Sequence, residues 1–426
     1  MEPSDDGPSP RRDLALATWG LFVGLAFLLL AAGLFGTLLG VRSELVKLPT
    51  AVSSLISASY YLGFLVGSRA ALSALGRVGH IRVFAALASL LSAAMLTVGL
   101  TESAPAWAWL RFVTGLCLAG QYVVAESWLN DLATNENRGR LLAIYAVVTS
   151  GAFGMGQLLL FRMDARAITG FAIASIITSL AVAPVALSEE AVAPGVTERQ
   201  NISLRDLAKV VPTGVGSCLL VGVAHGALTG MAAIYATRVG LSTGRIGLFV
   251  AAPNIGGMLL HWPVAAASDD IDRRAVGFAA SCTAIGAAVL LLLGPSTSSM
   301  ALLLMAALGG FSYPLYSIAA AYANDWIEPE HVNAAASQLV TLYGLGAVIG
   351  PFVAAGMMIA VGAKGFFWAA IILHSLLAAF FLYRILSFRS PLAKRPWSEV
   401  SLPARAFFVP ATVVAMGRRY RIKRSR

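Results

Sequence analysis

Hydrophobic residues gather in long apolar segments that are separated by short polar connections. A helix that crosses lipid needs about 20 mostly apolar residues. Twelve segments reach that length. The pattern predicts spanning helices at about 14–40, 50–73, 81–101, 105–133, 139–161, 166–187, 209–238, 244–267, 274–294, 299–323, 331–361 and 364–387.

One long polar connection, 188–208, divides these segments six from six. We therefore predict an all-α membrane protein with an N-terminal six-helix bundle at 14–187 and a C-terminal six-helix bundle at 209–387. Residues 1–13 are expected to form a short N-terminal segment. Residues 388–426 are expected to form a basic C-terminal tail.

The two halves repeat each other at a nearly constant spacing. The connection 76–82 recurs 193 residues later as 269–274, and Gly151 recurs as Gly344 at the same spacing. Three further matches at a spacing of 194 are Gly115 with Gly309, Asn130 with Asn324 and Asp131 with Asp325. The repeat predicts duplicated six-helix units related by a pseudo-two-fold axis.

Composition and charge place the chain in a membrane. It is 58% hydrophobic and only 12% charged, against roughly 25% charged in soluble domains, so a soluble enzyme is excluded. Although the net charge is +10, eleven of the 31 Lys and Arg residues lie in 384–426. This favours contact of the tail with anionic lipid over binding to nucleic acid.

The distribution of Lys and Arg also predicts the orientation. With the N-terminus inside, the inner segments hold 23 of these residues and the outer loops hold seven. Positive residues collect on the cytoplasmic side. We therefore expect both termini in the cytoplasm and a multi-pass location in the cell (inner) membrane.

Two ionisable residues lie within the fourth apolar segment, where such groups are costly and usually functional. Arg111 and Glu126 face the same side of a helix but lie about 22 Å apart along it. A buried carboxyl such as Glu126 could carry a proton, or it could bond structurally to Ser127, Asn130 or the backbone. Arg111 could bind an anion or favour the charged form of a neighbouring acid, or it could snorkel outward near the interface.

A histidine and several polar residues within other segments are further candidates. His225 lies about halfway along the seventh segment, where it could bind substrate or titrate, or simply satisfy packing. The remaining candidates could line a cavity or form interhelical hydrogen bonds. They are Tyr60, Tyr61, Gln121, Tyr122, Gln157, Asn254 and Tyr316.

Charged residues at the cytoplasmic helix ends are candidates for a gate. Opposite charges there could pair across the two halves and with helix dipoles, and so stabilise the state closed on that side. The alternative is that positive residues simply collect inside. We favour a gate role for Asp269 with Arg273 and topology for the others, which are Arg77, Arg138 and Arg140.

No cofactor or catalytic chemistry is indicated. The chain shows no phosphate-binding loop, so ATP is not the expected energy source. Its three cysteines show no metal-ligand spacing, and no catalytic triad stands out. We predict that the protein is not an enzyme, holds no metal and acts as a monomer.

Several of these motifs resemble the major facilitator superfamily. Arg111 followed by Gly115 resembles its fourth-helix motif, and the connections at 76–82 and 269–274 resemble its signature and the repeat of that signature. The acid of the first signature is replaced here by Gly76. Within the superfamily, the stretches 125–130 and 138–145 are similar to those of the YcaD-type bacterial branch.

The resemblance implies a transporter that works by alternating access and assigns Arg111 to coupling. The expected cargo is a small amphipathic molecule, because the central helices carry few fixed charges. Proton-coupled export is the leading mode. The alternatives are a lipid or lysolipid flippase, a proton-linked uptake carrier and, from a different class, a membrane receptor or assembly partner that does not transport.

Overall fold

The computed structural model describes residues 10–133, 137–188, 203–328 and 331–387. Three predicted segments lie wholly or mostly outside these residues. They are the tail at 388–426, most of the segment 1–13 and most of the connection 188–208. The described helices are α1 (Pro10–Leu45), α2 (Thr50–Val78), α3 (His80–Leu100), α4 (Ala104–Leu132), α5 (Arg138–Leu158), the 3-10 turn η1 (Leu159–Arg162), α6 (Thr169–Leu180), α7 (Val182–Ala186), α8 (Leu204–Val210), α9 (Pro212–Arg238), α10 (Thr243–Asp270), α11 (Arg273–Leu293), α12 (Ser299–Ser312), α13 (Pro314–Asn324), α14 (Val332–Val361) and α15 (Gly365–Ser387).

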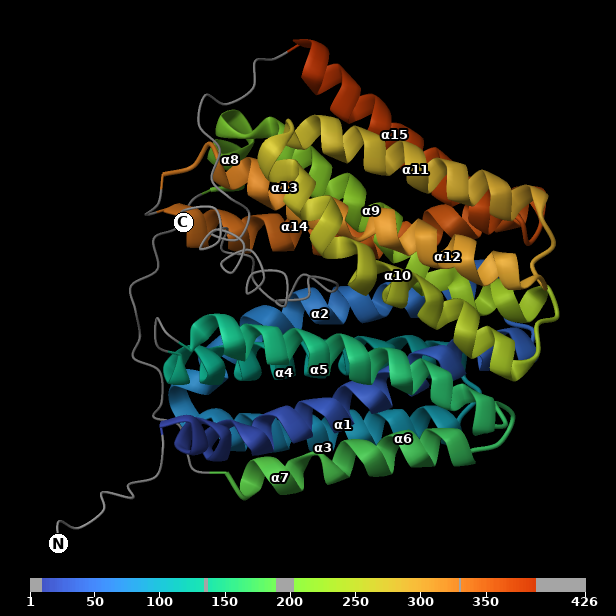
Figure 1. Cartoon of the computed structure of the whole chain (residues 1–426). Helices are drawn as coiled ribbons and strands as arrows, with labels where there is room; N and C mark the ends of the chain where they lie inside the picture. The colour runs from blue at the N-terminus through green and yellow to red at the C-terminus, as the bar shows by residue number, and fades with distance from the viewer. Residues whose placement is uncertain (1–9, 134–136, 189–202, 329–330, 388–426) are drawn as a thin grey trace, which may run out of the picture.

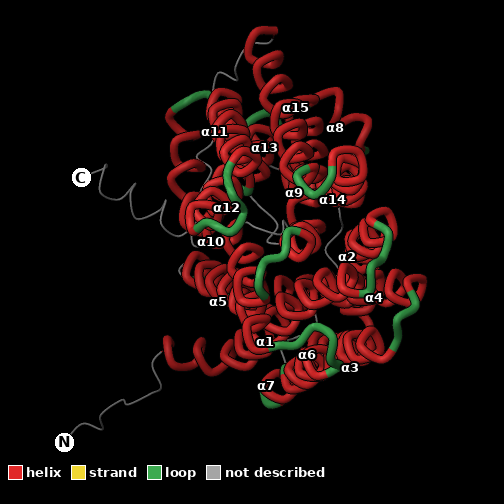
Figure 2. The backbone as a smooth tube through the Cα atoms, turned by 90° about the vertical axis from the view of Figure 1, so that its right-hand side faces the viewer, coloured by secondary structure: helices red, strands yellow, loops and turns green. Residues whose placement is uncertain are grey.

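The prediction of twelve spanning segments is confirmed. Among the described residues, twelve helical segments are long and apolar enough to cross a membrane. Helices α6 and α7 together form the sixth span, and α12 and α13 form the tenth. The spans run side by side in two groups, with α1 to α7 in one bundle and α9 to α15 in the other (Figures 1 and 2).

Prolines shape several of these spans. The tenth span is divided where α12 ends at Ser312 and α13 begins at Pro314, because proline has no N–H to continue the ladder of hydrogen bonds. Pro253 and Pro263, in contrast, lie inside the continuous helix α10. Proline thus interrupts one central helix of the C-terminal bundle and is tolerated in another.

Glycines at helix crossings repeat between the bundles. Gly63 on α2 lies so close to the carbonyl oxygen of Phe112 on α4 that a Cβ would overlap it. In the C-terminal bundle, Gly256 on α10 lies in the same way against the carbonyl oxygen of Ala306 on α12. The glycines are 193 residues apart and their partners 194, so the sequence repeat corresponds to the same helix crossing built twice.

The bundles meet chiefly through three pairs of helices, besides smaller contacts of α2 with α9 and of η1 with α10. Helix α2 packs against α14, α5 against α10, and α1 against α9. In the third pair, a Cβ on Gly40 would lie 2.8 Å from the Cβ of Ala233. These two residues are also 193 positions apart, so equivalent positions of the two halves meet where α1 passes α9.

Candidate functional site

A cavity lies between the two bundles, near the end where α2 begins and α9 ends. The space between its walls is about 970 Å³ when the open solvent at its mouth is included. The wall comes from α1, α2, α4 and α5 on one side and mainly from α9 and α10 on the other. Among the predicted site residues, it includes Arg111, Tyr60, Tyr61, Gln157 and Asn254.

Arg111 brings a permanent positive charge to the wall of this cavity. Its guanidinium carbon lies 4.3 Å from the centre of the Tyr60 ring and 5.5 Å from that of Phe35. Cation–π contacts of this kind contribute about 0.5–2 kcal/mol. The side chain therefore points inward between aromatic rings, which agrees with a role in the cavity and not with outward snorkelling.

Hydrogen bonds cross the cavity from one bundle to the other. The Asn254 amide nitrogen donates to Gln157 Oε1 at 2.9 Å, and the Tyr61 hydroxyl bonds to that of Thr229. Ser57 Oγ donates to a backbone carbonyl of α9 at 2.9 Å. Residues that line the space thus also join the bundles, so a rearrangement of the bundles would change the shape of the cavity.

An ion pair joins the bundles at the end beyond the cavity. Arg238, at the end of α9, donates from Nε to Glu44 Oε1 at 2.8 Å and from Nη2 to Glu44 Oε2 at 2.9 Å. The same guanidinium donates to the hydroxyl of Thr50 at 3.0 Å. Because the pair is bidentate and connects α1 with α9, we call Glu44 and Arg238 the bridging pair.

Replacing Glu44 by glutamine is expected to favour separation of the bundles at this end by roughly 1 kcal/mol, or about fivefold in population, because one charge of a partly exposed pair is removed. Distances between spin labels on the two bundles would measure it. The matched control is Arg42→Gln, which breaks the pair with Glu102 inside the N-terminal bundle. An equal change in both variants would contradict a specific role for the bridging pair.

His225 lies away from the cavity wall, in the packing of the C-terminal bundle. It is 2% exposed, and its Nε2 lies 3.0 Å from the carbonyl oxygen of Ser312. Its Nδ1 lies 3.0 Å from the Tyr343 hydroxyl. A neutral imidazole that donates from Nε2 and accepts at Nδ1 satisfies both contacts, so the geometry favours the packing interpretation.

Four other candidates also lie outside the cavity wall. The Gln121 amide donates to the carbonyl of Phe84 at 2.9 Å within the N-terminal bundle. Tyr316 is 2% exposed and its ring lies 5.0 Å from that of Tyr343. Tyr122 packs against Phe64 at 6.1 Å. Glu126, one turn further along α4, is partly buried and its charge acts on Tyr122.

Arg273 is at the centre of a buried charge cluster in the C-terminal bundle. Its side chain is 1% exposed, and its Nε donates to Asp325 Oδ2 at 2.7 Å. Its Nη1 donates to Asp269 at 3.2 Å and to Ser268 at 3.0 Å. Asp269 therefore pairs with Arg273 within the C-terminal bundle, and not across the two halves as the gate hypothesis requires. A role of this pair as a gate stays a prediction.

The other gate candidates are more exposed. Arg77 and Arg140 have exposed side chains, which agrees with their assignment to membrane topology. Arg138 begins α5, but its side chain lies outside the part of the chain that the structure describes. Their roles at a gate also stay predictions.

Sequence reasoning did not select several residues that the structure makes prominent. Glu44 and Arg238 are 194 positions apart, which makes them equivalent positions of the two halves. Equivalent positions can meet only near the pseudo-two-fold axis, so the repeat could have indicated this contact. His80 and Arg273 are 193 apart. His80 Nε2 lies 3.6 Å from Asp131, in the place that the Arg273–Asp325 pair takes in the other half.

Twelve spanning helices in two similar bundles, with a polar cavity between them, define a multi-pass membrane protein with the architecture of a carrier. The model of the Major Facilitator Superfamily matches residues 14–312 and 215–421. The chain belongs to this family of transporters.

Comparisons with single proteins agree with this family assignment. The chain is 31% identical over 348 residues to the uncharacterized MFS-type transporter YcaD of Salmonella arizonae, covering 79% of this chain and 88% of that protein. The nucleoside transporter NupG has a similar structure, with a TM-score of 0.70 and 11% identity over 88% of this chain and all of that one. A bacterial homologue of the human lysosomal transporter Spinster, solved in an inward-facing and occupied conformation, is also similar, with a TM-score of 0.65 and 15% sequence identity. That match covers 90% of this chain and 98% of the homologue.

Proposed function

We propose that this protein is a secondary active transporter that exports a small amphipathic molecule in exchange for protons. The observation that carries the proposal is the cavity, because it is lined by both bundles and bordered by hydrogen bonds that cross between them. A site at the interface of two repeats opens to alternate sides when the bundles rock about it.

With both termini in the cytoplasm, the bridging pair lies on the outer side. The structure then corresponds to a state in which the outer ends of α1 and α9 are joined. Breaking these contacts while the opposite ends of the bundles close would expose the cavity outward. The protein works as a monomer in this scheme, since each chain contains both bundles and the whole cavity.

Glu126 is the proposed proton carrier. It lies on α4 about 22 Å from Arg111 along the helix axis, on the side of the cavity away from the bridging pair. A carboxyl group inside a membrane span can exchange a proton when water reaches it from one side. The proposed coupling is that protonation of Glu126 changes how α4 packs and thereby favours one of the two states.

The test is proton movement in liposomes that contain the purified protein, with a panel of candidate substrates and an imposed pH gradient. Glu126→Gln is expected to abolish substrate-dependent proton flux, because glutamine cannot carry the proton. The matched control is Glu102→Gln, since Glu102 lies outside the spans and its side chain is 67% exposed. The control is expected to retain the flux.

Three outcomes would change the proposal. Unchanged flux in Glu126→Gln would assign coupling to another group. Proton and substrate movement in the same direction would indicate uptake instead of export. An absence of flux with every substrate, in protein whose folding is verified by circular dichroism, would contradict proton coupling and favour the flippase or the receptor.

A further inference from the structure

The charge of Arg111 has no counter-ion among the described residues. None of the ion pairs formed by those residues includes it. Removal of a cation from water is costly even after relaxation, and the two ring contacts of the guanidinium recover only part of that cost. Since the guanidinium lies at the cavity wall, an anion inside the cavity would supply the missing interaction.

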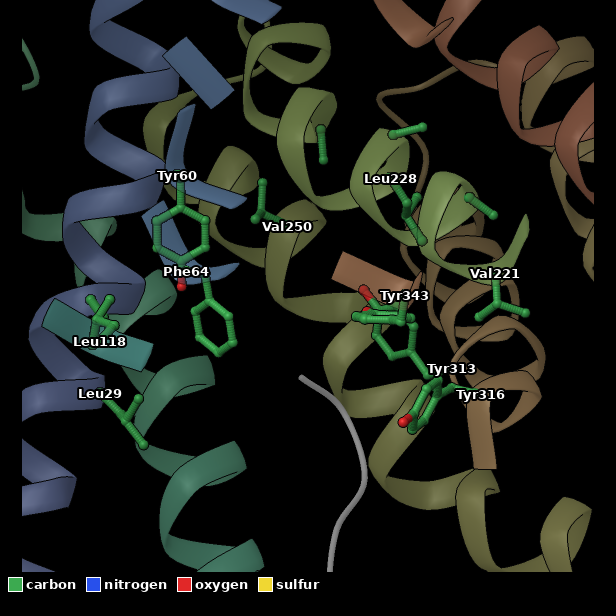
Figure 3. Close-up of a cluster of buried hydrophobic side chains, with 14 of the residues drawn as sticks. Leu29, Tyr60, Phe64, Leu118, Val221, Leu228, Val250, Tyr313, Tyr316 and Tyr343 are labelled. Carbon is green, nitrogen blue, oxygen red and sulfur yellow. The ribbon is translucent and has the colours of Figure 1, made fainter. Parts of the chain in front are cut away.

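Aromatic rings line the cavity on both sides. Tyr60 and Tyr61 come from α2, and their rings meet edge to face at 5.3 Å. Tyr313, at the junction of α12 and α13, lies across from Tyr60 (Figure 3). Flat rings pack well between such side chains. The remaining wall combines aliphatic side chains, such as Leu118 and Leu228, with hydroxyl and amide groups.

Two polar atoms at the cavity wall are buried and have no hydrogen-bond partner within the described part of the chain. They are the Asn254 amide oxygen and the Ser53 hydroxyl oxygen. Ser53 is 1% exposed. A buried polar atom without a partner destabilises the structure, because it has lost its hydrogen bonds to water. An N–H or O–H group on a bound molecule would satisfy the amide oxygen, which can only accept a hydrogen bond.

We infer that the substrate of the proposed transport function is a small aromatic organic anion that also carries a hydrogen-bond donor. Its carboxylate, or a similar anionic group, binds the guanidinium of Arg111. Its ring lies between the tyrosines of α2 and Tyr313. Such a molecule carries a single charge on an apolar body and is amphipathic.

Direct binding tests this inference with three molecules that share one ring: para-hydroxyphenylacetate, its neutral amide and the cation tyramine. Calorimetric titration of the full chain in lipid nanodiscs is expected to show the acid binding about tenfold or more tightly than the amide, because a carboxylate–guanidinium bond is charge-assisted. Tyramine is expected to bind most weakly. Equal affinities for the acid and the amide, or no binding of the acid, would overturn the inference.

Variants of Arg111 connect the preference to its charge. Arg111→Gln is expected to remove the difference between acid and amide, whereas Arg111→Lys retains part of it. The matched control is Arg69→Gln, which removes another arginine from a spanning helix; Arg69 donates to Thr341 at 3.2 Å and does not line the cavity. A preference for the acid that persists in Arg111→Gln would contradict the assignment. The wild-type comparison decides the ligand class even if this variant does not fold.

The same three molecules separate this inference from the proposed function. If the acid binds selectively but drives no flux in liposomes, the inference stands and the proposed function fails. If the amide or tyramine is transported in exchange for protons while the acid is not, the proposed function stands and the inference fails.

Discussion

Replacing Asp325 by asparagine is expected to lower the free energy of unfolding of the C-terminal bundle by about 3 kcal/mol or more. The side chains of Asp325 and Arg273 are 0% and 1% exposed, and removal of Asp325 takes away the buried, shorter ion pair of Arg273 and leaves the longer contact with the partly exposed Asp269. Reversible unfolding in mixed micelles, followed by circular dichroism, would measure the change.

The equivalent position in the N-terminal bundle provides the control. Asp131 is 32% exposed at its side chain, and His80 Nε2 lies 3.6 Å away. Because water already reaches this carboxylate, Asp131→Asn is expected to cost less than about 1 kcal/mol. The two substitutions are chemically identical and lie 194 positions apart, so their difference measures the effect of burial and of the arginine partner.

A double variant separates charge from packing. Arg273→Met combined with Asp325→Leu removes both buried charges and keeps apolar volume, so it is expected to recover much of the stability lost in Asp325→Asn. If the double variant is less stable than Asp325→Asn, the geometry of the pair matters more than the compensation of its charge. If Asp131→Asn and Asp325→Asn cost the same, burial does not decide the energetics of these pairs.

The spans could be predicted because their signal is local. A run of apolar residues must be satisfied by its own backbone hydrogen bonds in lipid, so composition and length determine where the helices lie. The duplication could be predicted from residue spacing. The contact that this duplication produces between Glu44 and Arg238 was missed, because both residues lie at helix ends where charges also serve topology.

The site could be predicted only in part, because apolar helices with scattered polar residues do not show which face meets a cavity. Arg111, Tyr60 and Tyr61 were selected as polar residues within spans, and the structure places them at one cavity. Gln121 was selected on the same ground, yet it bonds to the backbone of its own bundle. Whether such a residue faces the cavity or the inside of its bundle depends on how helices that are far apart in the sequence cross. A single sequence does not contain that information.

Replacing Gly256 by alanine is expected to destabilise the C-terminal bundle by about 1–3 kcal/mol, the usual cost of overpacking. The new Cβ would overlap the carbonyl oxygen of Ala306. A backbone oxygen cannot rotate away as a side chain can, so α10 and α12 would have to separate. Gly63→Ala should have a similar effect on α2 and α4, where the same crossing occurs.

The same substitution at Gly286 is the control, because a Cβ there meets no atom within 4 Å. Alanine is a better helix former than glycine by up to about 1 kcal/mol, so Gly286→Ala is expected to leave stability unchanged or to raise it. Thermal melting of the three variants would compare the effects.

A melting temperature in Gly256→Ala as high as that in Gly286→Ala would show that α10 and α12 can move apart at little cost. In that case the helices that cross at these glycines can shift relative to each other within a bundle. Loss of stability in both Gly63→Ala and Gly256→Ala would instead show that the crossing is rigid, so that each bundle moves as one body.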